Sequence, residues 1–403
     1  MNGLTVGVLE NHRAPLVSTV LCYRAGTREE PARHAGLAHF LEHMMFRGSR
    51  RFGAGEVDRR TLALGGSNNA YTTHDSTVYH FTFTSDRWVE ALDMEADRMA
   101  GLRLEPEEID TERAVILEEI GMCEDDPWEA LELEVHAALF DGHPYGRPIL
   151  GTRESLARIG GQELAGFHRR RYRPDNAVLV VAGDVDGGAF EAVADRFGLL
   201  PAGAAPAARG PTHAGRTGEL HRIVRRRGDL ARLLLALPAP AAGAADFAPL
   251  RLLLTILGGG RASRLHRALV DERELCLSVS TDIAETVEPG LAEIALEVVT
   301  GAEPQEVEAR ALEEVHGVVE GAIQEEEVAR AQRMLLADWV FGFEKIHQQA
   351  LNAAVSLALF DPDYLQRHLQ EILECSVERL REVGGAYLVP EKGGVIGWSL
   401  PET

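Results

Sequence analysis

The sequence predicts an α+β fold with two homologous domains. Its 403 residues exceed what one ordinary hydrophobic core accommodates. A stretch rich in Pro, Gly and Ala, LPAGAAPAARGPTHAGRTGE, lies near the middle, and strand-like and helical segments follow one another in a similar order on both sides of it. We therefore expect one domain at residues 1–200, a linker at 201–218 and a second domain at 219–403. Each would be a mixed or antiparallel sheet backed by helices.

The first half begins with two strand-like runs, LTVGVLE and APLVSTVLCYRAG. A helical stretch at about 34–46 follows, and after it come a Gly-rich turn and the alternating segment AYTTHDSTVYHFTFTS. We then expect helices at about 86–101, 106–123 and 127–140. A strand in HRRRYRPDNAVLVVAGDVD ends this half.

The second half repeats this order in outline. LARLLLALPA and LAEIALEVV have the pattern of strands. Helical periodicity predicts helices at 245–257, 261–272, 304–321 and 324–360.

The charge balance argues against a nucleic-acid partner. Lys and Arg number 41 against 63 for Asp and Glu, a net charge of 41 − 63 = −22, whereas binding nucleic acid requires basic groups that neutralise phosphates. Such a field suits a basic peptide substrate, and it equally suits a protein that is merely kept soluble by its acidic surface. Charge alone does not decide between these interpretations.

The four cysteines, Cys22, Cys123, Cys276 and Cys375, are far apart and form no CxxC pair. This spacing favours neither a disulfide framework nor a cysteine-based zinc site, and it fits a reducing compartment. The N-terminal residues lack a basic segment followed by a long apolar run, and no stretch reaches the roughly 18 apolar residues of a membrane span. We expect a cytoplasmic protein with no membrane segment.

A helical segment carries the motif His39-x-x-Glu42-His43. Residues three and four apart share a helix face, so both imidazoles can reach one metal ion while the carboxylate points toward the same place. The neighbouring apolar stripe, at helical spacing, comprises Leu37, Phe40, Leu41, Met44 and Met45.

This donor set indicates zinc chemistry. Catalytic zinc sites use three protein ligands from imidazole and carboxylate groups and leave a fourth position to water. Glu42 can then act as the general base that takes a proton from that water. The order of the motif is that of the inverzincin peptidases. Two core histidines paired with a carboxylate would be the alternative interpretation if the chain offered no third ligand.

The best candidate for a third ligand lies in the expected helix from Pro106 to Cys123, where Pro106 suits the first helical position. On a helical projection, Glu112 and Glu119 share an otherwise apolar face, whereas Glu118 points away. Burying two carboxylates costs several kcal/mol unless a cation compensates them. We therefore favour Glu119 over the adjacent Glu118 as the third ligand, and expect Glu112 to orient one of the ligands without binding the metal itself.

At this point the sequence resembles the pitrilysin and mitochondrial processing peptidase family. The resemblance covers most of the chain and includes HAGLAHFLEHMMFRGS, GGSNNAYTTHDSTVYH, ERAVILEEIGMCEDDP, HPYGRPILGTRESL, RYRPDNAVLVVAGDVD and LGGGRASRLHRAL. It implies one zinc ion per chain, held by His39, His43 and Glu119, with Glu42 as base and Glu112 as accessory carboxylate.

The resemblance also implies a half clamshell of two homologous domains. Two such chains, or one chain of double length, enclose a chamber that admits unfolded peptides. In that family the segment corresponding to Asn69, Ala70, Tyr71 and Thr72 lies near an edge strand that takes up substrate by strand addition.

The sequence departs from the family at one place. The family's second half usually offers an Arg and, seven residues later, a Tyr that reach the substrate, but Val270 and Leu277 occupy those positions here. A missing oxyanion donor costs on the order of 3 to 4 kcal/mol. We therefore expect a heterodimer with a homologous partner subunit that supplies Arg and Tyr. A shifted role for Arg267 or Arg273 is the rival explanation.

Two other functions remain open. Members of this family also serve as non-catalytic scaffold subunits, although His39, Glu42, His43 and Glu119 together argue against that role. A dedicated maturation peptidase that trims a ribosomally made precursor is a narrower enzymatic alternative.

Overall fold

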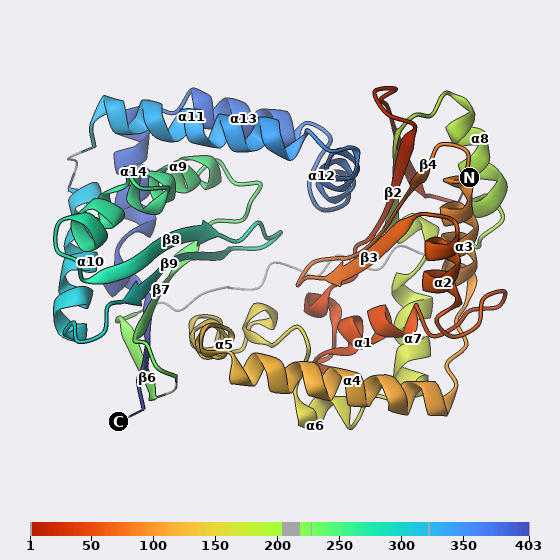
Figure 1. The fold of residues 1–403 in the computed structure, drawn as a ribbon, viewed down its shortest axis with the longest axis horizontal. Coiled ribbons are helices and arrows are strands. Elements are labelled where there is room, and N and C mark those ends of the chain that lie inside the picture. Colours follow the sequence, from red (N-terminus) through yellow and green to blue (C-terminus); the bar gives the residue numbers. More distant parts are fainter. Residues whose placement is uncertain (1, 204–217, 227, 321–322, 403) are drawn as a thin grey trace. The chain divides into compact units, whose positions relative to one another are not determined.

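The computed structural model describes residues 2–203, 218–226, 228–320 and 323–402 (Figure 1). The chain forms two compact units. The first unit comprises Met1–Gly121, Pro148–Arg209 and Val340–Pro362. The second unit comprises Met122–Arg147, Gly210–Trp339 and Asp363–Thr403.

The first unit is built on a five-stranded sheet with the order β1-β5-β2-β4-β3. β1 and β5 are parallel, and the other neighbouring pairs are antiparallel. The apolar runs of β2 and β5 lie inside this order, whereas the polar strand β3 lies at an edge. The strands are β1 (Thr5–Glu10), β2 (Leu16–Tyr23), β3 (Ser67–Thr72), β4 (Thr77–Thr84) and β5 (Ala177–Gly183).

The second unit repeats this sheet strand for strand. Its order is β6-β10-β7-β9-β8, again with one parallel pair, β6 and β10, and antiparallel pairing elsewhere. The strands are β6 (His221–Arg226), β7 (Arg232–Ala239), β8 (Cys276–Ile283), β9 (Gly290–Val298) and β10 (Val395–Leu400). Two mixed sheets of identical topology confirm the predicted α+β class with a repeated domain.

Helices cover both faces of the first sheet. Alternate strand residues point to opposite faces, so Leu21, Phe81 and Leu179 join the core beneath one group of helices, while Val20 and Val180 face the other side. The helices over the face with Leu21, Phe81 and Leu179 are α1 (Leu37–Met44), α2 (Glu56–Ala63), α3 (Val89–Ala100), α4 (Pro106–Asp125), α6 (Arg153–Leu156), α7 (Gly161–Arg171) and α8 (Gly188–Phe197).

The second sheet is covered in the same way. One face packs against α5 (Pro127–Leu139), whose Leu131 and Val135 contact Leu234 and Val395 in a shared apolar cluster. The remaining helices of this unit are α9 (Phe247–Gly258), α10 (Pro304–Val319), α11 (Glu325–Gly342), α13 (Tyr364–Leu373) and α14 (Val377–Tyr387), together with the π-helical turn His266–Asp271.

Each unit takes one helix from the other half of the chain. α12 (Ile346–Leu359) lies on β2 and β5 of the first sheet, and Figure 1 shows it in blue beside β2. α5, which precedes residue 148, lies on β7 and β10, the equivalent strands of the second sheet. The two sheets are therefore completed by a reciprocal exchange of helices.

Several elements differ from the sequence-based expectation. The predicted helix 324–360 is two helices, α11 and α12, separated by residues 343–345. Three strands, β6, β8 and β10, were not expected. β6 is an edge strand with only two apolar residues, and β10 contains Gly397, which weakens a strand pattern. β8 is an edge strand that alternates apolar and polar residues as strands do. Of the predicted linker, residues 204–217 lie outside the described residues, so the division at 201–218 stays a prediction.

None of the helices in the described ranges is both long enough and apolar enough to span a lipid bilayer.

Candidate metal centre and active site

Helix α1 carries the HxxEH motif, and local contacts fix where it starts. Gly36 adopts φ +89° at the N-cap, and a Cβ there would approach the carbonyl oxygen of Leu150 to 2.5 Å, so glycine is required. The buried carboxylate of Glu30 accepts hydrogen bonds from the backbone N–H groups of Gly36 and Ala38. These bonds satisfy two of the free donors at the helix start and favour negative charge there.

The apolar stripe of α1 orients its polar residues. Leu37, Phe40, Leu41 and Met44 are 0 to 1% exposed in the core of the first unit. With that stripe anchored, the neighbouring face presents the motif side chains together, as helical spacing predicts.

Helix α4 supplies the two predicted carboxylates. Ile109, Ile116 and Ile120 are buried and anchor its inner face. Glu112 is 3% exposed, and Glu119 is partly buried with a side chain 36% exposed. Glu118 is exposed, so the structure places it on the outer face.

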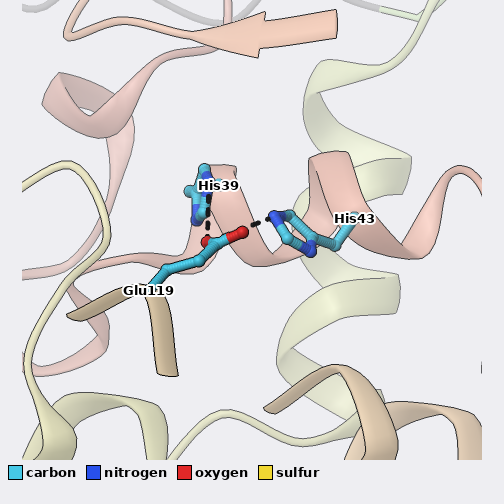
Figure 2. Close-up of side chains that lie close together, drawn as sticks. All are labelled: His39, His43 and Glu119. Carbon is cyan, nitrogen blue, oxygen red and sulfur yellow. Dashed lines mark ion pairs between the residues drawn. The ribbon is translucent and has the colours of Figure 1, made fainter. Parts of the chain in front are cut away.

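His39, His43 and Glu119 come together between α1 and α4 (Figure 2). One donor atom from each lies within 4.8 Å of the others. Glu119 Oε2 is 3.8 Å from His39 Nε2 and 3.6 Å from His43 Nε2. Glu119 Oε2 is also buried without a hydrogen-bond partner. Two imidazole nitrogens and one orphaned carboxylate oxygen fit a zinc ion with an open position.

The two imidazoles have different electrostatic surroundings. Burial, followed by repulsion from His43, lowers the pKa of His39 to about 3, which favours the neutral imidazole that a metal requires. Burial also lowers the pKa of His43, but its hydrogen bond to Glu112 and the charges of Glu119, Glu112 and Glu42 outweigh burial and raise that pKa.

Glu112 is the residue that holds His43 in place. Its Oε2 lies 2.9 Å from His43 Nδ1, and its other oxygen contacts the Arg47 guanidinium. Burial raises the pKa of Glu112, but the bond to His43 and the Arg47 charge outweigh it, so the pKa is lowered. With Nδ1 donating to this carboxylate, Nε2 is the nitrogen left to face Glu119.

Glu42 lies beside this cluster and is 8% exposed. Burial raises the pKa of its carboxyl, while a hydrogen bond from Thr72 opposes that shift. The Thr72 hydroxyl donates to Glu42 Oε2 at 2.6 Å. A cavity of about 200 Å³ adjoins the carboxylate and is lined by Glu42, His43, Phe46, Arg47, Gly55, Asp58 and Glu112.

The segment Asn69, Ala70, Tyr71 and Thr72 lies in β3, the edge strand of the first sheet. Ala70 and Thr72 face the α1 side, whereas Tyr71 packs against the cluster beneath α12. Asn69 is exposed, and its side-chain oxygen accepts a hydrogen bond from the backbone of Ala70. Only β4 pairs with β3 among the described strands, so β3 has one edge without a paired strand.

Val270 and Leu277, the two positions at which the sequence departs from the expected Arg and Tyr, lie in the second unit. Val270 is half-buried in the π-helical turn, and Leu277 is 53% exposed on β8. Of the rival arginines, Arg267 is exposed and contacts Glu272 at 3.7 Å, and Arg273 is also exposed.

Sequence reasoning missed three residues of the site. Arg47 contacts Glu112 and the Thr72 side chain contacts Glu42, both across elements distant in sequence. Glu30 lies just before α1 and binds the N–H groups at its start. Helical projection gives the direction of a side chain but not its partner on another element, so no pattern in the sequence identifies these contacts.

Comparison with known proteins agrees with this geometry. The family model "Insulinase (Peptidase family M16)" matches residues 6–153, and the model "Peptidase M16 inactive domain" matches residues 158–335. The uncharacterized zinc protease YmxG of Bacillus subtilis is 31% identical over 284 residues, which cover 69% of this chain and 67% of the relative. The chain belongs to peptidase family M16.

Other M16 relatives match over part of their length. An uncharacterized zinc protease of Mycobacterium leprae is 36% identical over 257 residues, covering 63% of this chain and 58% of that protein. The chain thus spans less than two thirds of that relative. In fold, a protease from Helicobacter pylori superposes with a TM-score of 0.92 at 23% identity, covering 99% of this chain and 98% of the other.

Proposed function

We propose that this chain is a zinc metallopeptidase subunit that hydrolyses peptides. The observation that carries the proposal is the cluster of His39, His43 and Glu119 with the buried carboxylate of Glu42 beside it. The names of its relatives, zinc proteases, support the same chemistry.

His39, His43 and Glu119 would hold the zinc ion, one per chain. When bound, zinc supplies Lewis acidity, which polarises a peptide carbonyl and lowers the pKa of a water molecule. Glu112 keeps His43 in the tautomer that leaves Nε2 free.

Glu42 acts first as the general base and then as the general acid. Its carboxylate takes a proton as the water oxygen bonds to the carbonyl carbon, and returns that proton to the amide nitrogen as the C–N bond breaks. The exposed edge of β3, including Asn69 and Ala70, would hold an extended peptide by strand addition. This mode of binding reads main-chain groups and therefore suits unfolded polypeptides.

We also propose a homologous partner subunit, in a heterodimer, that supplies Arg and Tyr. Val270 and Leu277 cannot donate hydrogen bonds from their side chains. An exposed Arg267 or Arg273 is the alternative donor within this chain. The predicted cytoplasmic location and the lack of a membrane or nucleic-acid partner stay predictions from composition.

The test uses the native protein, purified with whatever chain accompanies it. Zinc content is measured by atomic emission, and cleavage is measured on reduced, unfolded casein. We expect about one zinc per chain, with cleavage that is much faster when a homologous second chain is present. A folded, metal-free protein would instead indicate a scaffold, and full cleavage by this chain alone would contradict the heterodimer.

A further inference from the structure

Thr72 contacts the general base assigned above. Its hydroxyl donates to Glu42 Oε2 at 2.6 Å, and both residues are buried, Thr72 at 9% and Glu42 at 8% exposed. Among the hydrogen bonds described for Glu42, this is the one that reaches its carboxylate from another element. A hydrogen bond to a carboxylate is shorter and stronger than one between neutral groups, so it fixes orientation as well as position.

The Thr72 hydroxyl has two possible acceptors, Glu42 and Thr77. Thr77 lies directly opposite Thr72 in the β3–β4 ladder, with the two hydroxyl oxygens 3.3 Å apart. The Thr77 hydroxyl donates its single hydrogen to the carbonyl oxygen of Ala25 at 2.7 Å. Thr77 can therefore only accept from Thr72, and the Thr72 hydroxyl donates to the nearer and charged acceptor, Glu42 Oε2 at 2.6 Å.

Backbone and rotamer also restrict Thr72. It is the last residue of β3, and as a β-branched residue it has a stiff χ1 angle. Helix α1, which carries Glu42, packs on the same strand. The carboxylate is thus held between a helix and the strand whose free edge would take up peptide.

We infer that Thr72 is a positioning residue: its side-chain hydroxyl fixes the orientation of the Glu42 carboxylate toward the reacting water, while its backbone belongs to the strand that binds substrate. This inference rests on the proposed peptidase function. It assigns the Thr72 side chain to the base instead of the substrate, which its burial and its 2.6 Å bond support.

The experiment compares Thr72→Val, which removes the hydroxyl at nearly constant volume, with Thr72→Ser, which keeps it. The matched control is Thr19→Val in β2, because Thr19 is 2% exposed and its hydroxyl, buried in the same sheet, has no hydrogen-bond partner. Steady-state cleavage of an unfolded peptide, zinc content and thermal unfolding are measured on the native assembly of each variant.

We expect Thr72→Val to lower kcat by about tenfold to a hundredfold, the range found for residues that orient groups around a metal site. KM and zinc content should stay close to wild type, Thr72→Ser should restore most of kcat, and Thr19→Val should leave it unchanged. If Thr72→Val does not fold, Thr72→Ala is compared with Thr72→Ser in its place.

Two results would overturn the inference. A raised KM with unchanged kcat would place the Thr72 hydroxyl on the substrate, and an unchanged kcat and KM would leave it without a role in the reaction. Failure of the peptidase function is a separate outcome, because the wild-type assembly would then cleave no peptide at all.

Discussion

The two units share one strand order, but they differ in the residues of the helix that packs on the third strand along the chain, β3 in the first unit and β8 in the second. In the first unit α1 lies between β2 and β3 in the chain and packs on β3, whereas in the second unit α9 lies between β7 and β8 and packs on β8. Ten of the twelve residues of α9 are buried, and they are almost all apolar. α1 is buried to a similar extent but carries His39, Glu42 and His43.

This difference separates what builds the fold from what performs chemistry. Both sheets form because their central strands are continuous apolar runs buried on both faces, and both sheets are covered by apolar helix faces. The second unit fills the equivalent position with leucines such as Leu253 and Leu257. The first unit accepts the cost of the buried Glu42 carboxylate there, and the proposed zinc ion would offset that cost.

The largest expected effect is that of Glu42→Gln. Removing the general base should lower cleavage by about 10²- to 10⁴-fold. Zinc content should stay at the wild-type level, because the three metal donors are untouched. Peptide cleavage and metal analysis on the same preparation measure both quantities. Full activity in this variant would show that Glu42 is not the general base, so the polar residues of α1 would not distinguish the first unit from the second in catalysis.

Glu119→Gln should remove zinc, since one of three donors is lost. The loss in zinc affinity should exceed the roughly 10- to 100-fold that an outer-shell partner contributes. Glu118→Gln is the matched control, because Glu118 is adjacent but exposed on the outer face of α4. Competition with a fluorescent zinc chelator measures both affinities. Equal affinities in the two variants would refute the assignment of Glu119.

Glu112→Gln should have a smaller effect on zinc. The amide keeps the shape of the side chain but weakens its bonds to His43 and Arg47, so zinc affinity or activity should fall by about 10- to 100-fold. The same chelator competition measures the affinity. Wild-type zinc affinity together with wild-type activity would show that Glu112 does not support zinc binding.

The smallest effect concerns the second unit. His136 Nε2 lies 2.6 Å from Glu293 Oε1. Burial lowers the pKa of His136, but the bond to Glu293 and the charges of Glu293 and Glu132 outweigh it and raise the pKa. The pair should therefore stabilise the fold fully below the unfolded pKa of about 6.5, and this contribution should disappear as the pH rises through the higher folded pKa.

His136→Gln tests this pair. Thermal unfolding across neutral pH should show the difference from wild type shrink as the pH rises, while zinc content stays constant. The exposed pair of His316 and Glu391 is the control, because surface pairs contribute about 0 to 1 kcal/mol. A change in zinc content in His136→Gln would mean that the second unit is more than a framework.

The sequence was sufficient to predict features that depend on the residue pattern of a single helix or strand. The preference for Glu119 over Glu118 used only helical direction, and the structure places Glu118 on the outer face. The strands β2, β5, β7 and β9 were predicted from their apolar runs. In contrast, the edge strand β6 carries only two apolar residues among basic ones, which gives no distinctive pattern. The edge strand β8 does show the alternation of a strand, and this signal was missed. The bonds from Thr72 to Glu42 and from Arg47 to Glu112 depend on packing between elements.

The exchange of helices could not be predicted either, and it affects how the protein is made. The last strand of the first sheet ends at Gly183, and α12 begins at Ile346, 346 − 183 = 163 residues later. At roughly 5 to 20 residues per second of translation, synthesis of α12 begins roughly 8 to 33 seconds after that of β5 ends. Until then the apolar sheet face with Val20, Val178 and Val180 lacks the helix that covers it. During that time the nascent chain presents a surface suited to chaperones. Neither half expressed separately would bury both faces of its sheet.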